Sequence, residues 1–287
     1  MSTVVYGPPF VVEAATPQAP PYSLVATLKA LGLYHEDAAD PHWQNGVTVW
    51  PWPSGTPDAT VPCAAGTSRV KEDGTPVDIP IFGPITPYFA DACSTISVHD
   101  QETYVERATV AIRATESMPV ERQLVSGFFA PTNPFVGDLN VSLLNNGDPT
   151  DGQSSLALLE NAIGASGKQG IIHAPPAVVS AWDASGFTLV EDPSGFLRTK
   201  RGTPVVVGDG YIGQHPASVG APGDTEEWAW ATGLVSAWAN PEPFMIPATM
   251  REALDRETNF VVYRAEKTFV VEWDTELQAA VLVDWSA

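Results

Sequence analysis

Cysteines and long apolar runs are both scarce in this sequence of 287 residues. The two cysteines, Cys63 and Cys93, are too far apart for a metal-binding motif. We expect two free thiols, with a disulfide as the alternative. No early segment is typical of a signal peptide, and no apolar run has the length of a membrane span. The sequence therefore predicts a protein that has no membrane contact and is cytosolic when made.

Charge is also scarce, and positive charge most of all. Charged residues make up 17% of the chain, with 14 Lys and Arg against 34 Asp and Glu, for a net charge of −20. This balance repels polyanions and argues against binding of nucleic acid through phosphate contacts. The acidity serves either solubility alone or a container wall whose acidic lining keeps packaged DNA from adhering. Few charges combined with 23 glycines and 27 prolines favour a loop-rich protein that buries surface against partners.

Motifs for catalysis and cofactor binding are missing. The run 164–169 resembles a phosphate-binding loop only superficially, because Gln169 stands where serine or threonine is needed. No Gly-x-Ser-x-Gly elbow occurs, and His173 lies in an apolar run that is typical of a core histidine. The oxygen-rich run 145–151 lacks the terminal glutamate of a calcium loop. We therefore predict no enzyme, no cofactor and no metal site.

Residues 1–95 form an extended, proline-punctuated arm in our interpretation. The leucines at 24, 28 and 31 predict one short helix over 22–33. So long a stretch with little regular structure is unusual in a compact monomer. We therefore expect neighbouring subunits to supply its packing partners.

The strongest helix signal begins at Asp100, a good N-cap residue, and runs to Met118. Pro119 predicts a kink near Met118, with the helix resuming over 120–125 and ending at Gly127.

The rest of the chain mixes helices and strands. We predict a helix capped at Thr150 or Asp151, a buried strand over 170–174 and a helix opened by Pro175 and Pro176. A hairpin over 187–199 and a strand over 204–207 follow. Four more strands are expected near 228–238, 260–263, 268–272 and 279–285. The fold class is therefore α+β with an antiparallel-rich sheet.

Three tryptophans, at 43, 50 and 52, lie close together beside the proline-rich arm. Such a cluster fits either an interface between protein subunits or a platform that stacks on sugars. We favour the interface. The residues expected at contacts between subunits are Phe10, Trp43, Trp50, Trp52 and Tyr211.

Three groups of segments together resemble the major capsid proteins of tailed actinobacterial phages. The first group is PYFADACS at 87–94, ERA at 106–108 and PVERQLVSG at 119–127. The second is QGIIHAP at 169–175 and GTPVVVGDGY at 202–211. The third is NFVVYRAEK at 259–267, VEWD at 271–274 and AAVLVD at 279–284. Their order and spacing, over about residues 85–287, carry the resemblance.

The resemblance implies the Hong Kong 97-type capsid fold, which has an N-terminal arm, an extended loop, a long spine helix, and peripheral and axial domains. It would assign 1–95 to the arm and extended loop, and 96–150 to the peripheral domain with its spine helix. Residues 151–235 would form the axial domain, and the strands of 236–287 would return to the peripheral domain. Lysines are scarce, so covalent cross-links between subunits are not expected.

The function implied by the resemblance is self-assembly into hexamers and pentamers of an icosahedral capsid that encloses double-stranded DNA. The partner is the chain itself, with a portal, a separate scaffold or a decoration protein as further partners and the DNA contacted only indirectly. Assembly would take place in the host cytoplasm, and the protein would end in the virion. Two alternatives remain open: a tail or decoration protein that binds host glycans, and an encapsulin-like compartment.

Overall fold

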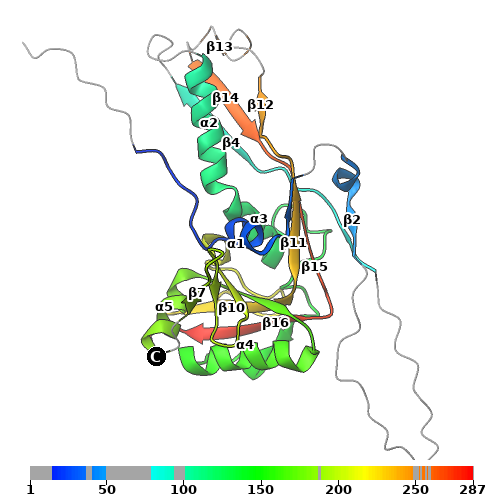
Figure 1. Ribbon diagram of the computed structural model, residues 1–287, viewed down its shortest axis with the longest axis vertical. Coiled ribbons are helices and arrows are strands. Elements are labelled where there is room, and N and C mark those ends of the chain that lie inside the picture. Colours follow the sequence, from blue (N-terminus) through cyan, green and yellow to red (C-terminus); the bar gives the residue numbers. More distant parts are fainter. Residues whose placement is uncertain are drawn as a thin grey trace, which may run out of the picture.

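The computed structural model describes residues 15–36, 41–49, 79–93, 101–186, 189–247, 252, 254–255, 257 and 260–286. Short elements link the larger ones, and Figure 1 labels many of the elements named below. These linking elements are η1 (Pro41–Asn45), η2 (Leu144–Gly147), η3 (Asp209–Tyr211) and the strand pair β2 (Val47–Thr48) and β3 (Ile81–Phe82). In the described part of the chain, every helix is too short or too polar to cross a bilayer.

A mixed seven-stranded sheet forms the lower part of the molecule in Figure 1. Its order is β5 (Ser142–Leu143), β16 (Gln278–Asp284), β10 (Glu226–Gly233), β6 (Gly170–Ala174), β9 (Pro204–Val207), β8 (Leu197–Arg198) and β7 (Val190–Glu191). The predicted buried strand is confirmed as β6, because all five of its residues are buried. The predicted hairpin is confirmed as β7 and β8.

Two helices pack with this sheet, and both begin as the sequence predicts. In α4 (Gly152–Ser166), the side chain of Asp151 accepts a hydrogen bond from the Ser154 amide, and Gly167 ends the helix in the left-handed region. In α5 (Pro176–Ala184), proline occupies the first turn, where no amide donor is needed.

The predicted single strand over 228–238 is two strands in different sheets. After β10, the chain enters β11 (Val235–Ala239), which lies between β1 (Tyr34–His35) and β15 (Phe269–Trp273) in a three-stranded sheet. A Cβ atom on Gly233 would stand 2.7 Å from the Asp274 side chain. The close approach of the turn before β16 therefore leaves room only for glycine at the end of β10.

The upper part of the molecule is a four-stranded sheet with one long helix. It comprises β4 (Tyr88–Cys93), β14 (Phe260–Glu266), β12 (Phe244–Ile246) and β13 (Leu254–Asp255). The helix α2 (Gln101–Thr115) covers one face, where Ala108 and Ile112 pack against Ala265. The expected cap at Asp100 lies outside the described residues.

The helix break lies slightly before the predicted position. The helix α2 ends at Thr115 and α3 (Ser117–Ser126) begins two residues later, so Pro119 lies in the first turn of α3. A proline ring clashes with the carbonyl four residues earlier, which here belongs to Thr115. The break therefore falls upstream of the proline. Gly127 ends α3 as predicted.

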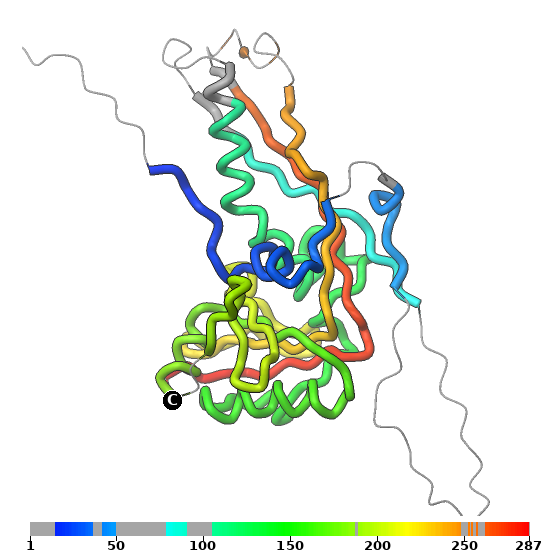
Figure 2. Tube along the Cα trace, viewed as in Figure 1, coloured from blue at the N-terminus to red at the C-terminus, as the bar shows by residue number. Residues whose placement is uncertain are grey.

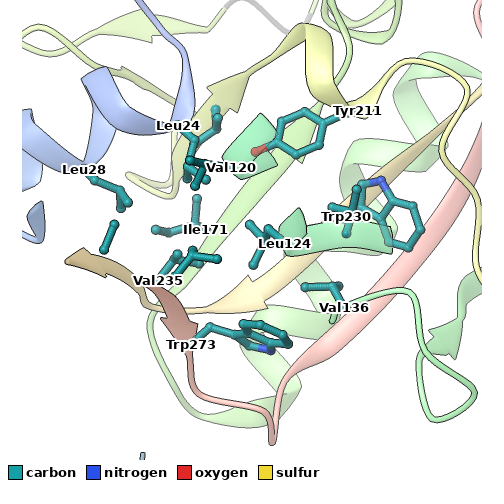
Figure 3. Close-up of a cluster of buried hydrophobic side chains, with 14 of the residues drawn as sticks. Leu24, Leu28, Val120, Leu124, Val136, Ile171, Tyr211, Trp230, Val235 and Trp273 are labelled. Atoms are coloured by element: carbon teal, nitrogen blue, oxygen red, sulfur yellow. The ribbon is translucent and has the colours of Figure 1, made fainter. Parts of the chain in front are cut away.

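Segments from both ends of the chain share one core. The short helix α1 (Leu24–Leu31), predicted over 22–33, packs on α3, and β1 pairs in parallel with β11 (Figure 2). Figure 3 shows the side chains that meet there: Leu24, Leu28, Val120, Leu124, Val136, Ile171, Tyr211, Trp230, Val235 and Trp273.

The strands of the segment 236–287 are divided between sheets. Strands β12 and β14 belong to the upper sheet, whereas β16 pairs along its whole length with β10 in the lower sheet. The reason is the apolar character of β16, whose five central residues are buried. A strand of this kind needs neighbours on both sides and cover on both faces.

Candidate assembly surfaces and the junction that positions them

A buried carboxylate joins three elements at the centre of the molecule. The Glu121 side chain, on α3, is only 1% exposed. It accepts hydrogen bonds from the Leu24 amide at 3.0 Å, the Ser117 hydroxyl at 2.7 Å and the Gly210 amide at 2.9 Å. Burial raises the pKa of Glu121 more than these three donors lower it. The first turn of α1 is thus capped by a side chain from another helix.

Glycines are required on the other side of this carboxylate. A Cβ atom on Gly208 would lie 2.3 Å from the Glu121 carboxylate, and one on Gly210 would lie 2.4 Å from the Met118 carbonyl oxygen. Since a Cβ atom essentially never lies within 3.0 Å of another heavy atom, only glycine at these two positions lets η3 approach α3 so closely. The GDGY run therefore has a structural reason in this chain.

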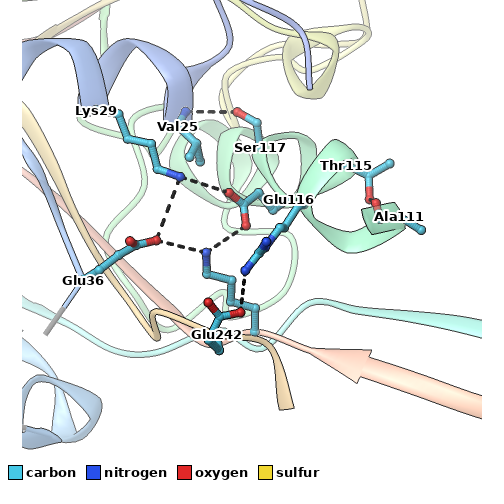
Figure 4. A network of polar contacts seen from close by, with 10 residues as sticks. Val25, Lys29, Glu36, Ala111, Thr115, Glu116, Ser117 and Glu242 are labelled. Atoms are coloured by element: carbon cyan, nitrogen blue, oxygen red, sulfur yellow. Dashed lines mark hydrogen bonds and ion pairs between the residues drawn. The ribbon is translucent and has the colours of Figure 1, made fainter. Parts of the chain in front are cut away.

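A second polar junction holds the N-terminal segment against the break between α2 and α3. Lys267, 1% exposed, places its ammonium nitrogen 3.0 Å from Glu116 and 3.4 Å from Glu36. Lys29 lies 3.7 Å from Glu116 and 3.9 Å from Glu36. Figure 4 shows Lys29 directed toward both carboxylates. Burial, assisted by these two carboxylates, raises the pKa of Tyr34. Two lysines and two glutamates thus tie α1 and β1 to the α2–α3 break and to the turn between β14 and β15.

We expect Glu121→Ala to lower the free energy of unfolding by about 2–4 kcal/mol, because two backbone amides lose their acceptor and a cavity opens. Chemical denaturation of the purified chain measures the change. Glu121→Gln separates the loss of charge from the loss of an acceptor, and Glu106→Ala, on the exposed face of α2, is the matched control. Equal stabilities of Glu121→Ala and Glu106→Ala would contradict the capping role.

Two of the residues expected at contacts between subunits lie in the core of the chain. Trp43 is 6% exposed and Tyr211 is 0% exposed. The Tyr211 hydroxyl is 3.0 Å from Nδ1 of His173. Trp43 and Tyr211 therefore pack within their own chain, and their expected place at contacts between subunits stays a prediction. Phe10, Trp50 and Trp52 lie outside the described residues.

Exposed apolar side chains on the upper sheet mark a candidate surface for contacts between chains, and none of them was predicted from the sequence. The outer face of the upper sheet, opposite α2, carries Tyr88, Phe244, Ile246 and Val262, all strongly exposed. Arg264 lies over the Tyr88 ring on the same face. Alternation along the strands, with Met245 packed inward between Phe244 and Ile246, is the sequence signal for this face. The apolar side chains surround the ion pair of Arg264 and Glu266 on this face, and exposed apolar groups gathered in this way are typical of an interaction surface.

The described residues offer little for catalysis. His173 is buried between Tyr211 and Thr232, and burial lowers its pKa to about 3, so it stays neutral near pH 7. The loop-like run 164–169 is the end of α4, and its Lys168 pairs with Asp274 at 2.8 Å. Among the residues described, no group of three or more His, Cys, Asp or Glu side chains could hold a metal ion.

Comparison with known proteins gives a match by structure. No protein-family model and no curated protein sequence matches the chain. The SrpI encapsulin of Synechococcus elongatus superposes with a TM-score of 0.52 at 12% identity, over 97% of this chain and 94% of that one. The capsid of an empty GTA particle gives 0.51 at 14% identity, over 97% and 95%. A chain of Mycobacterium phage Bobi gives 0.53 at 11% identity, over 99% and 97%.

These matches establish the architecture. The chain has the mixed α+β, Hong Kong 97-type fold of capsids and encapsulins across nearly its full length, which confirms the predicted fold class. The boundaries 1–95, 96–150, 151–235 and 236–287 stay predictions.

Proposed function

We propose that this chain is the structural subunit of a closed icosahedral protein shell. One observation carries the proposal: the fold of an encapsulin and of a GTA capsid matches this chain over 97% of its length, with no large part of either protein left over. The role is structural rather than catalytic.

The surface chemistry supports assembly from identical copies. The apolar face of Tyr88, Phe244, Ile246 and Val262 lies on a sheet that is held to the core mainly through α2 and the strand connections. Each contact between copies need only be weak, since many contacts together close a particle. The junctions at Glu121 and Lys267 hold α1 and β1 firmly against the core.

Within this class we propose the major capsid protein of a tailed phage, built of hexamers and pentamers around double-stranded DNA. The support is the series of sequence segments over 87–284 that resembles actinobacterial phage capsids. The net charge of −20 fits a wall that does not bind the DNA it encloses. A portal and a separate scaffold or decoration protein would be further partners, with assembly in the host cytoplasm and the mature shell in the virion.

Size-exclusion chromatography and negative-stain electron microscopy of the purified protein test the proposal. We expect closed shells that elute far ahead of a monomer. Nuclease-protected DNA in particles isolated from the native source favours the phage capsid, whereas enclosed protein cargo favours an encapsulin-like compartment. A monomer or small oligomer at high concentration that binds glycans would overturn the shell and support the tail or decoration protein.

A further inference from the structure

A groove on the lower sheet has the properties of a socket for an apolar side chain. It lies between α4 and the β7–β8 hairpin, with a volume of about 400 Å³. Leu156, Ala157 and Leu189 supply apolar walls, and Lys200 and Arg201 are exposed at its rim. The groove is therefore mainly apolar inside, although Glu160 and Asn161 also line it, and it carries basic side chains at its edge.

The positive rim is unusual in this acidic chain. Three of the 14 lysines and arginines stand within the four residues 198–201, the densest basic group in the sequence. Arg198 pairs with Asp192 and Arg201 with Glu160, whereas no ion pair to Lys200 occurs among the residues that the structure describes. A partner that places a negative charge beside an apolar side chain would form an ion pair with this rim while its apolar group enters the groove.

The opposite edge of the same sheet presents such a partner. Leu139, in the loop before β5, is 77% exposed and is the most exposed large apolar side chain in the described part of the chain. Asp138 precedes it, held in place by the Asn140 amide at 2.8 Å and the Gln278 side chain at 3.1 Å. From residue 123 to residue 167 the sequence contains no lysine, arginine or histidine. The edge therefore presents an apolar side chain at Leu139 with the carboxylate of Asp138 beside it.

The two surfaces cannot meet within one chain, since β5 and β7 are the outermost strands on opposite sides of the seven-stranded sheet. They can meet between two copies. A contact between different surfaces of identical subunits is heterologous and repeats from one copy to the next, closing a ring when the rotation permits.

We propose that Leu139 of one copy inserts into the groove between α4 and the β7–β8 hairpin of the next copy, with Asp138 facing Lys200 and Arg201. The inference rests on the proposed shell function and names one contact that builds it. The partner is a second copy of this chain.

Matched variants test the contact through the protein concentration at which half of the subunits assemble, measured by light scattering. Leu139→Lys places a positive charge against the basic rim, and Ala157→Phe fills the groove from the exposed face of α4. We expect each to raise the midpoint at least about tenfold. Leu139→Met keeps the apolar side chain, and Ala165→Phe adds the same bulk on α4 outside the groove; both should stay within about twofold. Circular dichroism and thermal unfolding establish that all four variants fold.

A disulfide test locates the contact directly. Protein carrying Leu139→Cys is mixed with protein carrying Asn161→Cys, which lines the groove, under mild oxidation. We expect a disulfide between different chains through positions 139 and 161, identified by mass spectrometry. The wild type and each single variant serve as controls, because they show the disulfides that Cys63 and Cys93 form by themselves.

The outcomes separate this contact from the shell itself. If the wild type forms shells, two results would overturn the contact and leave the shell function standing. One is normal assembly of both Leu139→Lys and Ala157→Phe, and the other is the absence of the 139–161 link in the mixed cysteine variants. Absence of wild-type shells would overturn the shell function. In that case, a 139–161 link between two chains in solution would still support the contact, and no link would overturn both.

Discussion

We expect Lys267→Ala to lower the free energy of unfolding by about 3–5 kcal/mol, the usual cost of removing one partner from a buried ion pair. The physical reason is that Glu116, itself buried, loses an ammonium group 3.0 Å away while staying out of water. Glu36 loses the same partner at 3.4 Å. Chemical denaturation of the unassembled subunit, at concentrations below assembly, measures the loss.

The second lysine of this junction supplies the control. Lys29 is near the same two carboxylates but its side chain is half exposed, so Lys29→Ala should cost less than about 1 kcal/mol. Combining Lys267→Met with Glu116→Gln removes both charges, and should restore part of the stability lost in Lys267→Met alone. Equal effects of Lys267→Ala and Lys29→Ala would show that the buried pair does not hold the N-terminal segment.

Acidification should destabilise the subunit through His173. Burial lowers the pKa of this histidine from 6.5 to about 3 in the folded chain. As the pH falls from 6.5 toward about 3, the unfolded chain binds a proton at this site and the folded chain does not, so stability is lost throughout that window. At about 1.4 kcal/mol per pH unit, the loss reaches about 4–5 kcal/mol at the acid end.

The His173→Gln variant isolates this effect from the titration of carboxylates. Glutamine keeps a polar group near Tyr211 and Thr232 but has no proton to gain. We therefore expect the free energy of unfolding to depend less steeply on pH in His173→Gln than in the wild type between about pH 6.5 and pH 4. His42→Gln, which changes an exposed histidine, should follow the wild type. Parallel curves for all three proteins would mean that His173 binds a proton in the folded state.

Local signals in the sequence were sufficient to predict most elements. Asp151 caps α4 through the Ser154 amide three residues along the chain, and Gly127 and Gly167 end their helices in the left-handed region. These interactions involve residues within one or two turns of each other, so composition and spacing reveal them. The break between α2 and α3 needed one further step, since the proline acts on the carbonyl four residues before it.

Interface residues were harder to predict, because an aromatic side chain fits a core and an interface equally well. Tyr211 was expected at a contact between subunits; within the chain it fills the space between α3 and β6, where its hydroxyl contacts His173. Leu139 was not selected, although it is far more exposed. Only the packing of distant segments shows which apolar side chains find a partner within their own chain.

By itself, the sequence determined the α+β class, the order of the main helices and strands, the acidity and the absence of familiar catalytic motifs, all of which depend on composition and on neighbours along the chain. Only the tertiary structure decided which surfaces stay open and which charges are buried. The amide of Leu24 finds its acceptor 97 positions away in Glu121, and Lys267 finds Glu36 at a separation of 231. Such partners are chosen by the packing of whole sheets and helices against one another, and no local pattern encodes that choice.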